Sequence, residues 1–202
     1  NKTGAFHELI FLPDSYKVAH KYSIESVKTI AVLWKNGIRP SDKYYWFDDQ
    51  MSYAMYVGDD EDDYNWLTGP HPGESLEYNK NLRWAATRNK FFVSTIRPHS
   101  VSSQLFITPQ DGRSFAEKYD RGEPNVLKPP SVYDIQINFN NTKEVLFDTF
   151  LAPLDYSIIS TAEIEDLDWI MTLGSSVFRP ISKFIIKIIQ GMNYYLPFGG
   201  YA

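Results

Sequence analysis

The stretch VYDIQINF at residues 132–139 decides the fold class of this chain. Its apolar residues Ile135, Ile137 and Phe139 alternate with the polar residues Asp134, Gln136 and Asn138. Because successive side chains of a strand point to opposite faces, this period of two predicts a strand with one buried and one solvated face.

Seven further short runs rich in apolar or aromatic residues predict strands of the same kind. They lie at residues 6–12, 30–34, 52–57, 83–86, 91–96, 104–108 and 144–151, and turn-forming residues separate them. No long helical pattern lies between these runs. We therefore expect antiparallel strands in two packed layers, not parallel strands joined by helices.

The composition is that of a folded, β-rich chain. Aromatic residues make up 16% of the 202 residues, which favours strands. The absence of cysteine excludes disulfides, thiolate metal sites and cysteine nucleophiles. A net charge of −5 gives no electrostatic support for binding nucleic acid. No run of about 18 apolar residues is present, so the sequence contains no candidate for a membrane-spanning helix.

After residue 155 the apolar pattern changes to a helical period. Ser160 and Glu163 have the spacing of a capping box, and Gly174 is a suitable helix end. The apolar positions between them are Ile164, Leu167, Ile170 and Met171. We expect a helix within residues 158–174 that packs these side chains against the β-sheet body of residues 1–157.

A second helix is predicted from about Pro180 to Met192. Six of its apolar residues, Ile181, Phe184, Ile185, Ile188, Ile189 and Met192, fall on one side at 100° per residue. Arg179, Lys183 and Lys187 fall on the other side, and the aromatic residues Tyr194, Tyr195 and Phe198 follow. Residues 175–202 carry a charge of +3, whereas residues 1–174 carry −8. This pattern is typical of a helix at a membrane surface, although a helix packed on the sheet body would also produce it.

Three stretches of the chain resemble the large periplasmic domain of bacterial YidC-type membrane protein insertases. LGSSVFRPISKF at 173–184 resembles the amphipathic helix at the end of that domain. FDTFLAPLDY at 147–156 resembles a strand and turn that precede it, and LRWAATRNKFF at 82–92 is similar to a tryptophan-containing strand followed by a second strand. The convincing resemblance covers residues 82–202.

The resemblance implies a mainly β fold, an antiparallel β-super-sandwich like that of galactose mutarotase, with C-terminal α-helices. It implies a noncatalytic scaffold on the periplasmic side of the bacterial inner membrane, without cofactor or metal, ahead of a membrane-spanning bundle. The implied partners are the membrane surface, that bundle, the Sec translocon and nascent membrane proteins, but no nucleic acid. The candidate membrane or partner interface comprises Phe178, Arg179, Lys183, Phe184, Lys187 and Ile188.

Two other functions remain open at this stage. A carbohydrate-binding or sugar-converting sandwich would need exposed aromatic residues with an acid–base pair, and no catalytic pair stands at a suitable spacing. His7 and Glu8 are adjacent and so point to opposite faces of a strand. A secreted adhesion module is the third possibility.

Three further patterns have ordinary structural explanations. The acidic run at residues 59–63 could bind calcium but lacks the EF-hand spacing, so we expect a solvated loop. The histidines His7, His20, His71 and His99 are far apart in sequence and are expected to be surface or structural residues. Basic and aromatic residues interleave at 83–92, where we expect a hairpin with aromatic side chains in the core and charged ones near the turn at Asn89.

Overall fold

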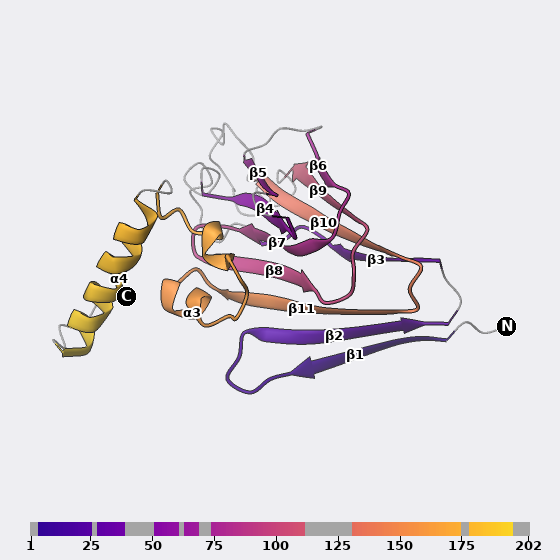
Figure 1. The fold of residues 1–202 in the computed structure, drawn as a ribbon, viewed down its shortest axis with the longest axis horizontal. Helices are drawn as coiled ribbons and strands as arrows, with labels where there is room; N and C mark the ends of the chain where they lie inside the picture. Colours follow the sequence, from indigo (N-terminus) through magenta and orange to yellow (C-terminus); the bar gives the residue numbers. More distant parts are fainter. Residues whose placement is uncertain are drawn as a thin grey trace, which may run out of the picture. The chain divides into compact units, whose positions relative to one another are not determined.

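The computed structural model describes residues 4–25, 28–38, 51–60, 63–68, 74–111, 131–174 and 178–195. The chain divides into two compact units, Asn1–Leu154 and Asp155–Ala202. The first unit contains the strands, and the second contains the helices (Figure 1).

The described part of the first unit forms two antiparallel sheets. The seven-stranded sheet has the order β1 (Ala5–Phe11), β2 (Lys17–Ile24), β11 (Glu144–Pro153), β8 (Phe92–Pro98), β7 (Leu82–Arg88), β4 (Tyr53–Gly58) and β5 (Tyr64–Thr68). The four-stranded sheet has the order β3 (Thr29–Trp34), β10 (Ser131–Asn140), β9 (Gln104–Asp111) and β6 (Leu76–Tyr78). The mainly β fold predicted from the sequence is thus confirmed, with every pairing antiparallel.

A hydrophobic core lies between the two sheets. Ile135 and Ile137 of β10 stand opposite Ile107 and Leu105 of β9, and all four side chains are buried. The same cluster includes buried residues of the larger sheet, namely Ala54, Tyr56, Leu67, Leu82, Ala85, Ile96, Val145 and Phe147. A fully buried aliphatic or aromatic side chain contributes about 1.5–3 kcal/mol to folding. Burial of one face of each sheet therefore joins them into two layers.

Each of the eight predicted strands is present, with ends shifted by a few residues. Three strands were missed, β2, β5 and β6. Strand β2, with the sequence KVAHKYSI, is half-buried along its whole length. Both its faces mix polar and apolar residues, so the alternation that reveals β10 is absent. Strand β6 has only three residues, too few for any period to show.

The helix predicted within residues 158–174 is wrong. A short helix α3 (Tyr156–Ser160) is capped by Asp155, whose side chain accepts a hydrogen bond from the Ser157 amide, so Ser160 ends a helix instead of starting one. Glu163 has a left-handed backbone with φ 57°, which stops helical propagation. A single 3-10 turn, η1 (Leu167–Ile170), follows. The predicted apolar positions Ile164, Leu167 and Ile170 are nevertheless buried.

The second predicted helix is confirmed as α4 (Arg179–Tyr195). Among the described residues, no helix combines the length and the apolar content that crossing a bilayer requires. The aromatic side chains Tyr194, Tyr195 and Phe198, which the sequence pattern placed after this helix, lie outside the described side chains.

The hairpin predicted at residues 83–92 is present as β7 and β8, but its side chains are arranged differently. Trp84 is buried as expected, whereas Phe91 and Phe92 are exposed. Arg88 is buried, and its Nε donates to the Met51 carbonyl at 3.1 Å. At the turn, Asn89 Oδ1 accepts hydrogen bonds from the backbone amides of Phe91 and Phe92, at 2.8 Å each. Turn geometry, not hydrophobicity, therefore places the two phenylalanines.

Candidate functional site

Helix α4 carries an exposed apolar face. At 3.6 residues per turn, six of its large apolar side chains cover an arc of about 140°. They are between 44% and 64% exposed, and comprise Ile181, Phe184, Ile185, Ile188, Ile189 and Met192. Most of the other described side chains of the helix are polar. An exposed face of this kind is unusual for a helix whose only role is packing within a domain.

Two cations on the other side of α4 are held by one carboxylate. Asp168 Oδ2, in the η1 turn, lies 2.5 Å from Lys183 Nζ and 3.3 Å from Arg179 Nη1. All three side chains are partly shielded from solvent. Because Asp168 has one negative charge and its partners have two positive charges, the group keeps a net charge of +1. The pairing fixes the start of α4 to the η1 turn of the same unit.

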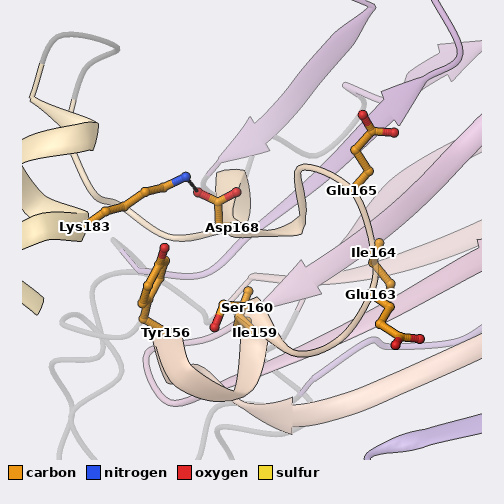
Figure 2. Close-up of a pocket in the computed structure, with 8 residues that line it drawn as sticks. All are labelled: Tyr156, Ile159, Ser160, Glu163, Ile164, Glu165, Asp168 and Lys183. Carbon is orange, nitrogen blue, oxygen red and sulfur yellow. Dashed lines mark ion pairs between the residues drawn. The ribbon is translucent and has the colours of Figure 1, made fainter. Parts of the chain in front are cut away.

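The carboxylate and Lys183 border a pocket of about 360 Å³ in the second unit. Figure 2 shows Tyr156 extending toward the Lys183–Asp168 ion pair, with Ser160 and Ile159 below it. Glu163, Ile164 and Glu165 complete the lining. In Figure 2 the carboxylates of Glu163 and Glu165 point away from that ion pair and from each other.

The chemistry of this pocket supports a structural role. Ligand pockets are mostly apolar, but only two of the eight lining residues are aliphatic. Its lysine is already paired with Asp168. Among the described residues of the chain, no group of three or more histidine or carboxylate side chains could hold a metal ion. We therefore infer that the pocket has a structural role, since it contains the ion pairs that attach α4 to the η1 turn.

The six residues predicted for the interface divide into two groups. Phe178, Phe184 and Ile188 are exposed, as an interface requires, and Lys187 is exposed too. Arg179 and Lys183 lie instead in the ion pairs with Asp168. Asp168 was missed as a partner, because it lies in a different element, 11 positions before Arg179 in the sequence.

The structure also brings together two of the histidines. His7 Nε2 lies 3.3 Å from His20 Nδ1, across neighbouring strands β1 and β2. The ring of His20 stacks on Phe147, and its Nε2 lies 2.9 Å from Thr149 Oγ1. Burial of His20, together with the nearby His7, lowers its pKa, while Asp148 acts in the opposite direction. Only the hairpin register reveals this pair, since the two histidines are 13 positions apart in the sequence.

The structure describes one of the other two histidines, His99. His99 Nε2 lies 2.8 Å from Asp148 Oδ2. His71 lies outside the described residues. Strand β1 contains both His7 and Glu8, so their side chains point to opposite faces, as expected.

The described part of the acidic run is tied to the connection between β6 and β7. Lys80 Nζ lies 2.8 Å from Asp60 Oδ2 and 2.9 Å from Asp63 Oδ2. The two carboxylates raise the pKa of Lys80, and Lys80 lowers that of Asp63. Burial and the same Asp63 raise the pKa of Tyr78 to about 12. Residues 61 and 62 lie outside the described residues. A lysine therefore serves as the cation for these acidic side chains.

No model of a known protein family matches the chain. Individual proteins do. A protein of Chlorobium limicola is 23% identical over 92% of this chain and 32% of its own length. A protein of Porphyromonas gingivalis is 22% identical over 88% of the chain and 29% of its length. A protein of Pelodictyon phaeoclathratiforme is 28% identical over 58% of the chain and 19% of its length.

All three of these relatives are named membrane protein insertase YidC. The chain spans about a third or less of the length of each of them. Two of the matches cover nearly the whole chain, including most of the first 81 residues, where the sequence motifs alone showed no resemblance. Over most of its length, the chain is a homologue of one part of the YidC-type membrane protein insertases.

Proposed function

We propose that this chain is a noncatalytic scaffold domain of a membrane protein insertase, on the extracytoplasmic side of the inner membrane. Its two-layered body is proposed to be a β-super-sandwich of the galactose-mutarotase type. The support comes from the names of the relatives and from the two antiparallel sheets with one core. In the intact protein we expect this domain to work beside the membrane-spanning bundle, the Sec translocon and nascent membrane proteins.

The observation that carries the proposal is the exposed apolar face of α4 beside a basic stripe. A helix with an apolar face and cations on its polar side binds in the plane of a membrane surface. We propose that α4 lies on the membrane in this way, with Phe184 and Ile188 toward the acyl chains. Arg179, Lys183 and Lys187 then face anionic head groups. This assigns the interface role to five of the six residues predicted from the sequence, and we propose that the sixth, exposed Phe178 just before the helix, joins them.

The energies are sufficient for reversible binding. Each basic residue near an anionic surface contributes about 1 kcal/mol, so three contribute about 3 kcal/mol at low salt, of which the charge of Asp168 offsets about 1 kcal/mol. The six apolar side chains of α4 are about half exposed, and immersing what is exposed adds about 1 kcal/mol for each. The apolar contribution therefore exceeds the electrostatic one. Binding should be present on neutral vesicles and stronger on anionic ones.

Cosedimentation of the 202-residue chain with vesicles tests the proposal. The triple variant Arg179→Ser, Lys183→Ser, Lys187→Ser should lose about 100-fold of its partitioning to anionic vesicles, the equivalent of about 3 kcal/mol. It should keep its binding to neutral phosphatidylcholine vesicles. A matched triple variant of exposed lysines in the first unit, Lys28→Ser, Lys35→Ser, Lys143→Ser, controls for net charge. If both triple variants lose equal affinity, α4 is not the membrane contact.

A further inference from the structure

Strand β1 forms an open edge of the seven-stranded sheet. Among the described strands it pairs only with β2, in an unbroken register from Ala5 opposite Ile24 to Phe11 opposite Val18 (Figure 1). Every second residue along its outer edge therefore presents backbone N–H and C=O groups without a strand partner among the described residues. All seven side chains of β1 are exposed, so both faces of this edge are accessible.

This edge lacks the features that normally protect a sheet from adding a further strand. Edge strands are commonly short, bulged, or rich in lysine and proline. Strand β1 has seven residues without lysine or proline, while the edge strands β3, β5 and β6 have six, five and three. Its two faces carry large apolar side chains that are 45–71% exposed, namely Phe6 and Ile10 on one face and Leu9 and Phe11 on the other. An added strand would cover apolar surface on both faces.

A row of charges ends at this edge. Glu8 of β1 stands opposite Lys21 of β2, and its charge raises the pKa of Lys21, although Glu144 has the larger effect. Lys21 Nζ lies 2.9 Å from Glu144 Oε2 of β11. The row therefore runs acid, base, acid across three strands, with the Glu8 carboxylate outermost. The next member that this alternation favours is a cation on an added strand.

We propose that the free edge of β1 binds an extended, apolar polypeptide segment as an eighth strand, with a basic side chain of that segment beside Glu8. Backbone hydrogen bonds supply affinity in this kind of recognition, and the side chains on each face supply selectivity. A second copy of this chain is a poorer occupant. Centred antiparallel pairing of two β1 strands would place Glu8 against its own copy, and directly opposed like charges destabilise a sheet. This surface lies on a different element from α4 and needs no membrane.

The test is fluorescence anisotropy of a labelled peptide of about nine residues, long enough to span β1, with a central lysine between alternating valine and threonine residues. The full chain should bind it saturably. A control peptide has the same sequence, but two of the backbone amides that point to each edge of the extended peptide are N-methylated. It should bind at least tenfold more weakly, because its side chains are unchanged but it can no longer form the backbone hydrogen bonds of a sheet. Equal binding of the two peptides would show simple hydrophobic adhesion and overturn the proposal.

A charge exchange locates the binding at β1. Glu8→Lys should weaken binding of the lysine peptide about two- to fivefold, as exposed cross-strand ion pairs do, and should favour a peptide with a central glutamate by a similar factor. The matched variant Glu77→Lys changes the same charge on β6, at the edge of the other sheet, and should leave both affinities unchanged. If Glu77→Lys has the same effect as Glu8→Lys, the edge of β1 is not the site. Sedimentation equilibrium showing a dimer that the neutralising variant Glu8→Gln strengthens would identify a second copy as the occupant instead and overturn the proposal.

Discussion

Replacing Asp168 by asparagine should strengthen binding of the chain to anionic membranes. Asp168 holds Arg179 and Lys183 at 3.3 Å and 2.5 Å, so it cancels one of the three positive charges around α4. The asparagine side chain is uncharged and of nearly the same size as the aspartate that it replaces. The local charge of this group of four residues, with Lys187 included, changes from +2 to +3.

The size of the effect follows from the same electrostatics. One additional unit of positive charge near an anionic surface is worth about 1 kcal/mol, which corresponds to about a fivefold increase in partitioning. The increase should shrink as salt rises, since exposed charges are screened within about 8–10 Å near physiological ionic strength. Neutral vesicles should show no such increase. The direction is opposite to that expected if Asp168 merely stabilised the helix for binding.

The assay is cosedimentation with vesicles that contain phosphatidylglycerol or lack it, at two salt concentrations. Asp14→Asn, at an exposed carboxylate of the first unit, removes the same charge as a control. Far-ultraviolet circular dichroism checks that the helix content is unchanged. Weaker or unchanged binding of Asp168→Asn to anionic vesicles, with its helix intact, would refute the assignment of these cations to the membrane surface.

Two further predictions concern the first unit. Ile137→Ala should lower the free energy of unfolding by about 2–5 kcal/mol in urea denaturation, because Ile137 is fully buried between the sheets, and a loss below about 1 kcal/mol would contradict the shared core. Stability should also fall as the pH drops below the ordinary histidine pKa of 6.5, since the folded state lowers the pKa of His20 and the unfolded chain takes up the proton more readily. His20→Gln should flatten this pH profile, and superimposable profiles of the two proteins would exclude His20 as the cause.

Several elements were predictable because their cause is local. The alternation around Ile135 and Ile137 is a property of adjacent residues, and so is the period that forms α4. The predicted helix at 158–174 failed because local signals conflicted. Asp155 caps the shorter helix α3, and the left-handed backbone at Glu163 prevents a helix from continuing through it. Most of its apolar positions were still correct, because burial selects hydrophobic residues whatever the backbone conformation.

Contacts between distant residues could not be predicted in the same way. The His7–His20 contact depends on the register of a hairpin whose second strand shows no alternation. The open edge at β1 depends on the order of all seven strands, to which residues from 5 to 153 contribute. The sequence shows which side chains are apolar or charged. It does not show which strand lies last in the sheet.

The amino-acid sequence by itself determined the β-rich class, the place of the amphipathic helix and the opposition of its apolar and basic sides. These properties depend on residues that are close together in the sequence, within the same helix or the same strand, so short-range periodicity specifies them. Only the tertiary structure decided that Asp168 holds two of the three cations, and that β1 leaves its apolar edge open among the described strands. Ion pairing and strand order depend on distances between residues that are not neighbours in the sequence, and folding of the whole unit sets those distances.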